Sequence, residues 1–296
     1  MQCIFCHKDA STSTSVEHIV PESLGNKHTY LPKGYVCDAC NHYFAIKIEK
    51  DLLNQPYFIS LRLRNEILSK KNRLVKQSVI FPGAQKKSEI SLQTQENTLV
   101  IHVHDEEVYN SIEDGKCDKM IVQYLPEPEY PSPLMSRFLA KCAYEFFLFN
   151  MGKGKYDLCV DELLGHNTDI LKPLREYARF GKGKYWQYSQ RRIYSEGSFF
   201  IKESRKVPYE ILHEMSFFIK NHINRPNGII KAEIYYVLVI SGIEYAICIS
   251  DPDISEYITL TQEKEFSPLR NEDEQMLPFS KADVNPMFIK KGQKLK

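Results

Sequence analysis

The sequence predicts an α+β fold in which a small cysteine-rich module precedes a larger region of helices and antiparallel strands. Residues 1–55 are polar, loop-rich and dense in Cys and His. Residues 78–125 contain β-rich runs separated by turn-forming or charged residues, as in an antiparallel meander. The remainder mixes apolar helical patterns with further β-rich runs. Because 296 residues exceed the usual size of one domain, we expect three parts: 1–55, 56–130 and 131–296.

Two Cys-x-x-Cys pairs frame the first module. They comprise Cys3, Cys6, Cys37 and Cys40. Four thiolates form the closed tetrahedral shell that structural zinc prefers, and a segment this short needs a metal to fold. A zinc ion with four cysteine ligands has no open coordination position, so any catalysis must come from other residues.

Two other interpretations of the first pair are weaker. The letters CIFCH also match a c-type haem attachment pattern with His7 as axial ligand, but this requires an exported chain and leaves the second pair unused. A thioredoxin-like dithiol is expected in a βαβ context, which is missing around Cys3. Structural zinc in a reducing compartment is therefore the favoured interpretation.

The next elements follow from periodicity. After Pro56 the run YFISLRLRNEILSKKNRL predicts a basic amphipathic helix, because its apolar residues recur at helical spacing. The β-rich runs SVIFPG, EISLQT, NTLVIHVHD and KMIVQYL predict the meander. The segment PEPEYPSP, with four prolines in eight residues, predicts an extended connector.

Beyond the connector we expect a second core of helices and strands. The run LMSRFLAKCAYEFFLFNMG predicts an apolar helix that ends at Gly152, and KPLREYARFG predicts a short helix closed by Gly181. The runs EIYYVLVISG and IEYAICISD predict a β-hairpin with a Gly-containing turn. The basic end KKGQKLK is expected to fray.

The segment between the cysteine pairs carries a family resemblance. It reads VEHIVPESLGNKHTYLPKGYVC, and the second pair continues into NHYFAIKIEKDLL. The order C-x-x-C, E-H-I-x-P-E-x-L-G and C-x-x-C-N resembles the HNH endonuclease superfamily, in particular its zinc-knuckled branch. The resemblance covers residues 1–55 and implies a ββα-metal fold.

By this resemblance His18 would be the general base, and Glu17 and Asn41 would be ligands of a catalytic divalent ion. Histidine suits this role because its pKa allows it to deprotonate water near neutral pH. Mg²⁺ or Mn²⁺ prefers oxygen ligands, which a carboxylate and an amide supply. Many family members also carry an Asn before the second pair that orients the base, whereas LPKGYV stands here. Asn26 or a main-chain carbonyl is the expected substitute.

Basic residues outside the module are candidates for DNA contacts. They are Arg62, Arg64, Lys70, Lys71 and Arg73, for which a solvated helix face is the alternative. The run RFGKGKYWQYSQRRIY suits base stacking and phosphate contacts as well as a place in the second core. His102 and His104 share one strand face at a chelating spacing, but a solvated face is favoured because no third ligand is evident.

The overall composition excludes few functions. The net charge of +1 argues neither for nor against a polyanionic partner, and no signal sequence or membrane span is evident, which favours a cytoplasmic location. The resemblance implies a metal-dependent endonuclease that hydrolyses DNA phosphodiester bonds, with RNA also open as a substrate. Residues 131–296 would bind substrate, sense a signal or regulate the module, as in phage-defence or restriction systems. The alternative is a non-catalytic zinc-dependent nucleic-acid-binding module. A homodimer would be needed for paired strand cuts.

Overall fold

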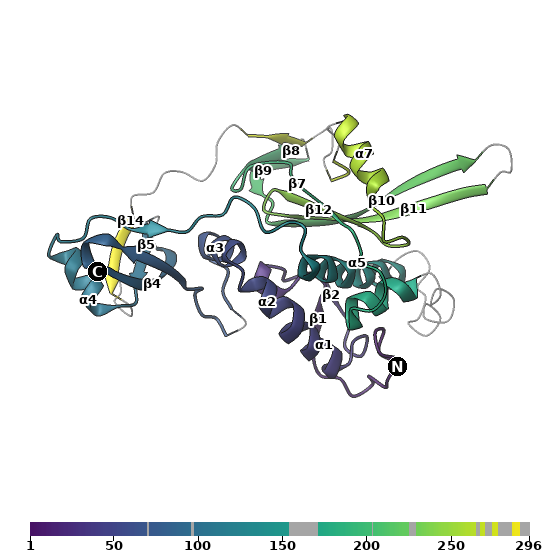
Figure 1. Ribbon diagram of the computed structural model, residues 1–296, viewed down its shortest axis with the longest axis horizontal. Coiled ribbons are helices and arrows are strands. Elements are labelled where there is room, and N and C mark those ends of the chain that lie inside the picture. Colours follow the sequence, from purple (N-terminus) through teal and green to yellow (C-terminus); the bar gives the residue numbers. More distant parts are fainter. Residues whose placement is uncertain are drawn as a thin grey trace. The chain divides into compact units, whose positions relative to one another are not determined.

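A computed structural model of the chain describes residues 1–69, 71–95, 98–153, 171–202, 204–224, 229–264, 267–269, 274–277 and 286–290. It confirms the α+β fold (Figure 1). The chain divides into two compact units. The first comprises Met1–Pro21, Asn26–Asp51 and Glu129–Lys281, and the second comprises Glu22–Gly25, Leu52–Pro128 and Ala282–Lys296. No helix among the described residues is long and apolar enough to cross a membrane.

The N-terminal module consists of a two-stranded ribbon and a helix. Strand β1 (Glu17–His18) pairs antiparallel with β2 (Tyr30–Leu31), and a 3-10 turn, η1 (Glu22–Leu24), lies between them in sequence. Helix α1 (Asp38–Phe44) starts directly after Cys37 and continues into the π-helical segment η2 (Ala45–Glu49) and α2 (Lys50–Leu53). The order of two strands and a helix is the one that the resemblance implies.

Helix α5 (Pro133–Lys153) is the long apolar helix of the first unit, as predicted. Much of its sequence is buried, including Phe138, Leu139, Cys142 and Tyr144, so it is covered on several sides rather than on one face. Residues 171–180 form the second predicted helix. Gly181 ends it with a φ of +64°, and its N–H bonds to the Tyr177 carbonyl.

Antiparallel sheets complete the first unit. One sheet has the order β10-β11-β12-β7, and another has the order β13-β8-β9. Their strands are β7 (Ser189–Arg192), β8 (Phe199–Lys202), β9 (Arg205–Glu210), β10 (His213–Asn224), β11 (Ile229–Ile240), β12 (Ile243–Cys248) and β13 (Glu274–Met276), and helix α7 (Ser255–Lys264) follows β12. The β11–β12 hairpin confirms the prediction, with Ser241 and Gly242 both at positive φ in its turn.

The aromatic run after Gly181 divides between core and surface. Trp186 and Tyr188 are buried, and the Trp186 indole N–H donates to the Cys248 carbonyl at 2.6 Å. Phe180 and Tyr185 are exposed. The sequence left open whether this run stacks on bases or belongs to the core. Trp186 belongs to the core.

The second unit is built on the predicted meander. Its five-stranded sheet has the order β14-β5-β4-β3-β6. The strands are β3 (Gln77–Phe81), β4 (Lys86–Gln95), β5 (Thr98–Val103), β6 (Ile121–Val122) and β14 (Pro286–Lys290), with the 3-10 turn η3 (Pro82–Ala84) after β3. Helix α4 (Glu106–Glu113) follows β5, and the parallel pairing of β14 with β5 brings residues near the C-terminus into this sheet. Neither α4 nor β14 was expected.

The basic helix after Pro56 is shorter than predicted. Helix α3 (Pro56–Arg64) ends because Glu66 adopts a φ of +52°, and the N–H of Ile67 then bonds back to the Arg62 carbonyl at 2.9 Å. Its first turn begins with proline, which suits the start of a helix. Lys71 and Arg73 therefore lie on a loop and not on a helix face.

Candidate functional site

The four N-terminal cysteines form one cluster. Their sulfur atoms all lie within 4.8 Å of one another, and Cys6 Sγ is 3.6 Å from Cys37 Sγ. Tetrahedral Zn–S bonds of about 2.3 Å place sulfur atoms about 3.8 Å apart, so the cluster fits a structural zinc. Within the part of the chain that the structure describes, no other group of three His, Cys, Asp or Glu residues is placed to hold a metal.

Local backbone hydrogen bonds prepare this cluster. The His7 N–H bonds to the Cys3 carbonyl while His7 adopts a φ of +59°, which closes the first turn tightly enough for both thiols to face inward. The Cys37 N–H donates to Cys3 Sγ at 3.3 Å. The hydrogen bond between Cys3 and Cys40 lowers the pKa of the Cys3 thiol to about 4 and raises the pKa of the Cys40 thiol, so that without a metal the negative charge lies on Cys3.

Helix 171–180 packs against the cysteine cluster from outside the N-terminal module. Arg179 Nε donates to Cys40 Sγ at 3.2 Å, and its guanidinium lies 3.7 Å from the centre of the Tyr43 ring. Arg175 also contacts the His7 ring. A zinc ion with four thiolates carries net negative charge, so the guanidinium of Arg179 is well placed to stabilise it.

Strand β1 presents Glu17 and His18, and the segment before it is held against α1. The Asp38 carboxylate, in the first turn of α1, accepts hydrogen bonds from the Thr14 N–H at 3.1 Å and the Ser15 N–H at 3.0 Å. A hydrogen bond from the Ser15 hydroxyl, together with these two N–H bonds, lowers the pKa of Asp38 to about 2. The helix that carries Cys40 therefore also holds the segment from which β1 starts.

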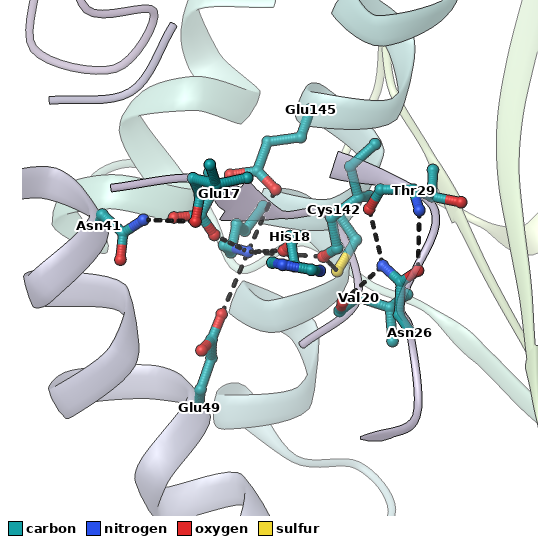
Figure 2. Close-up of polar contacts among 12 residues, drawn as sticks. Glu17, His18, Val20, Asn26, Thr29, Asn41, Glu49, Cys142 and Glu145 are labelled. Carbon is teal, nitrogen blue, oxygen red and sulfur yellow. Dashed lines mark hydrogen bonds and ion pairs between the residues drawn. The ribbon is translucent and has the colours of Figure 1, made fainter. Parts of the chain in front are cut away.

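Asn41 reaches this strand directly. Its Nδ2 donates to the Val16 carbonyl at 3.2 Å, one residue before Glu17 (Figure 2). Glu17 and His18 thus lie on β1, and the Asn41 side chain of α1 is fixed to the residue just before them. A carboxylate and an amide are the oxygen donors that Mg²⁺ or Mn²⁺ accepts, so the donor set fits a divalent ion held by these two side chains.

A fully buried lysine of α5 contacts the same site. Lys141 Nζ lies 2.6 Å from Glu17 Oε1, 3.2 Å from Glu49 Oε1 and 3.1 Å from Glu145 Oε2. Figure 2 shows these three carboxylates turned toward one point. Burial alone would lower the pKa of Lys141, but the carboxylates outweigh it and the pKa lies well above its usual value. These directions favour a charged lysine, whereas burial raises the pKa of the neighbouring Glu145 carboxyl well above its usual value.

Main-chain carbonyls of β1 are held by α5 as well. Lys141 Nζ lies 3.1 Å from the His18 carbonyl and 3.4 Å from that of Ile19, and the Cys142 thiol donates to the Ile19 carbonyl at 3.0 Å. The His18 ring lies 5.7 Å from the Tyr30 ring on the partner strand, and its Nδ1 is buried. The backbone and ring of His18 are thereby restricted from two sides.

Asn26, the expected substitute for the missing asparagine, braces the loop after β1. Its Nδ2 donates to the carbonyls of Val20 at 2.8 Å and Thr29 at 2.7 Å, and its Oδ1 accepts from the N–H of Thr29 at 2.9 Å. The side chain is buried, and these bonds to the main chain account for its amide group. Asn26 shapes the turn between β1 and β2.

The candidate DNA-contacting residues belong to the second unit. Arg62 is partly buried, and burial lowers its pKa. Arg64 contacts Ser60 and lies over the Tyr124 ring at 5.1 Å. Lys71 is exposed, Arg73 lines a pocket of about 600 Å³ together with His102 and His104, and Lys70 lies outside the described residues. Among the candidates that the structure describes, Lys71 and Arg73 are exposed on the loop, whereas Arg62 and Arg64 are half-buried.

Sequence reasoning missed Lys141, Glu145 and Cys142. One signal for them exists in the sequence, because a Lys and a Glu four residues apart are unusual in a helix as apolar as LMSRFLAKCAYEFFLFNMG. Charged side chains in such a helix require buried partners. The partners themselves, Glu17 and Glu49, carry no signal that links them to this helix.

Comparison with known proteins identifies the N-terminal module. Residues 3–57 match the family model of HNH endonucleases. No curated protein and no solved structure shows significant similarity to the chain. The match contains the cysteine cluster, β1, β2 and α1. Residues 3–57 therefore form a module of the HNH endonuclease family, of the kind that carries a cysteine cluster fitted for zinc.

Proposed function

We propose that the protein is a divalent-metal-dependent endonuclease that hydrolyses phosphodiester bonds in DNA. The observation that carries this proposal is the hydrogen bond from Asn41 to Val16, which holds the α1 side chain beside Glu17 and His18 within a matched HNH module. The cysteine cluster holds zinc and performs no chemistry, because all four positions are filled by thiolates.

Each residue has one task in the reaction. Glu17 and Asn41 would hold a divalent ion, and Mg²⁺ or Mn²⁺ bound there would stabilise negative charge at the phosphate and at the departing oxygen. His18 accepts a proton from a water molecule as its oxygen bonds to phosphorus. The bond from phosphorus to the 3′ oxygen then breaks, and this oxygen takes a proton from solvent water. The products are a 5′-phosphate and a 3′-hydroxyl.

The remainder of the chain would select and position the substrate. Basic residues of the second unit, among them Lys71 and Arg73, would contact phosphates without reading base sequence. A role in phage defence or restriction is part of this proposal, with residues 131–296 as the sensing or regulatory part. One such site cuts one strand, so paired cuts would require a homodimer.

Plasmid cleavage tests the proposal. Purified protein is incubated with supercoiled DNA, and with an RNA of similar length, in Mg²⁺, Mn²⁺ or a chelator. We expect nicking that depends on the ion and that His18→Ala abolishes. His28→Ala is the matched control, because His28 is an exposed histidine in the same loop. Cleavage that survives His18→Ala would remove His18 from the mechanism.

A second candidate function is nucleic-acid binding without cleavage. The ion pair between Glu17 and the buried Lys141 favours it, since the carboxylate proposed to bind the ion already has a cationic partner at 2.6 Å. Salt-sensitive DNA binding that is equal in the wild type and His18→Ala, with no cutting under any divalent ion, would support this candidate.

A further inference from the structure

Lys141 connects the rest of the first unit to the nuclease module. The residue belongs to α5, which lies well outside the matched segment 3–57. Its side chain is fully buried, and its ammonium lies within 3.4 Å of oxygen atoms from Glu17, Glu49, Glu145, His18 and Ile19. Glu145 shares its helix, whereas the other four partners lie in the module.

The choice of a lysine here is costly unless it has a specific use. Removing an ammonium from water without compensation is strongly unfavourable, and an apolar replacement of a buried ion pair is often neutral or stabilising. A long apolar helix such as α5 could pack against the module with leucine or methionine at this position. The presence of a charged residue at this position is therefore explained by the groups that it contacts and not by packing.

The closest partner is Glu17, the proposed ion ligand, at 2.6 Å. The same ammonium lies 3.1 Å from the main-chain carbonyl of His18, the proposed base. Carboxylates that ligate metals are commonly oriented by a hydrogen bond to their other oxygen. Lys141 is placed to do this for Glu17 while it also restricts the backbone that carries His18.

We propose that Lys141 is a positioning residue of the nuclease site, and that α5 is therefore a working part of that site. It fixes one oxygen of the Glu17 carboxylate so that the other is presented to the divalent ion, and Glu49 and Glu145 hold its ammonium in place. This inference rests on the proposed function. It differs from it by assigning part of the ion site to a helix outside the HNH module.

Direct binding of Mn²⁺ tests the inference without relying on cleavage. Mn²⁺ affinity is measured by electron paramagnetic resonance of the free ion for the full-length wild type, Lys141→Met and the double variant Lys141→Met/Glu145→Leu. The double variant removes the charged pair within α5, so it keeps the test possible if the single variant folds poorly. Leu139→Ala is the matched control, because it opens a cavity in the same buried helix without touching Glu17.

We expect Mn²⁺ binding to weaken roughly 10- to 100-fold in both Lys141 variants and to stay at the wild-type level in Leu139→Ala. Zinc content should remain at one ion per chain in all of them. Raising the Mn²⁺ concentration should restore cleavage by the Lys141 variants, which a defect of folding alone would not allow.

Two results would overturn the inference. One leaves the proposed function intact, and the other overturns it as well. Unchanged or tighter Mn²⁺ binding in the Lys141 variants, beside a wild type that binds and cuts, would show that Lys141 is only a structural brace or competes with the ion. A wild type that neither binds Mn²⁺ nor cuts DNA would overturn the proposed function itself, and the role of Lys141 with it.

Discussion

Single polar side chains hold the loops of this protein by bonding to main-chain groups. Asp38 anchors residues 14 and 15, Asn26 closes the turn between β1 and β2, and Asp105 caps α4. Each has one or more main-chain partners within 3.2 Å. These hydrogen bonds come at little cost in stability, because the main-chain N–H and C=O groups of a loop need hydrogen-bond partners in any case.

Asn26→Ala should destabilise the first unit. The substitution removes hydrogen bonds from a buried site and leaves the carbonyls of Val20 and Thr29 without their amide partner. The expected loss is about 1–3 kcal/mol of unfolding free energy. Denaturant unfolding measures it, with Asn150→Ala as the control, because Asn150 is exposed and bonds only within its own helix. Equal stability of the two variants would contradict the bracing role.

Asp105 should make the start of α4 sensitive to acid. Hydrogen bonds from Lys86 and from the N–H of Val108 lower the pKa of Asp105 below its usual value of 3.8. A carboxylate with a lowered pKa stabilises the fold fully above pH 3.8, and that stability is lost as the pH falls through the lowered pKa. The protection factors of the Glu107 and Val108 amides, obtained from hydrogen exchange after correction for the intrinsic pH dependence, should therefore fall in that range. Asp105→Ala should exchange quickly at every pH.

At this scale the sequence predicts candidate site residues but not the side chains that contact them. The cysteine spacing and the E-H and C-N dipeptides point to Glu17, His18 and Asn41 because these residues lie in one short motif. Their assignment to catalysis stays a prediction. Lys141 escapes such reasoning, since its contact with Glu17 depends on how a distant helix packs.

Elements in this fold end where a residue takes a left-handed backbone conformation. Glu66 ends α3, Gly181 ends helix 171–180, and Gly242 turns the chain between β11 and β12. Glycine adopts this conformation without strain, whereas Glu66 is held in it by the hydrogen bonds that close the helix.

Gly242→Ala should strongly destabilise the β11–β12 hairpin. Gly242 has a φ of +87°, and an added Cβ would lie 2.1 Å from the Tyr194 carbonyl oxygen. Gly183→Ala is the matched control, because Gly183 has a φ of +91° but nothing within 4 Å of its added Cβ. We expect a loss of about 1 kcal/mol or more from backbone strain in both, and a clearly larger loss at Gly242. Thermal unfolding compares them, and equal shifts would contradict the steric argument.

Helices and strands were predictable where the pattern that indicates them lies within a short stretch of sequence. The β11–β12 hairpin, the meander and α5 follow from short apolar runs and from turn residues. Strand β14 was missed because its parallel partner β5 lies far away in sequence and leaves no local pattern. Helix α3 is shorter than predicted because Glu66 adopts a positive φ, and glutamate is not a residue type for which a positive φ is expected.

At the scale of the whole molecule, each unit combines segments that are far apart in sequence. The first joins the N-terminal module to residues 129–281, and the second joins residues 52–128 to the segment that contains β14. Changes in composition along the sequence can indicate only parts that are contiguous in sequence. The predicted division into three contiguous parts, with boundaries at residues 55 and 130, therefore stays a prediction.

Removal of zinc should affect more than the cysteine cluster. The cluster anchors α1, α1 holds the segment before β1, and β1 bonds to α5. Treatment with a strong chelator should therefore lower the melting temperature of the first unit and abolish Mn²⁺ binding at Glu17 and Asn41. Zn²⁺ should reverse both effects, whereas Mg²⁺ alone should not. Circular dichroism melts with Cys37→Ser as a second route to zinc loss provide the measurement, and an unchanged melt would contradict a structural zinc.

The contact between Lys141 and the His18 carbonyl spans 123 positions of sequence. A ribosome adding about 5–20 residues per second needs roughly 6–25 s to cover that distance. During this interval the strand that carries Glu17 and His18 exists without the helix that grips it. Under the proposed function, a nascent chain would carry the N-terminal module before α5 holds its β1 strand, and cleavage would become possible only after α5 has emerged.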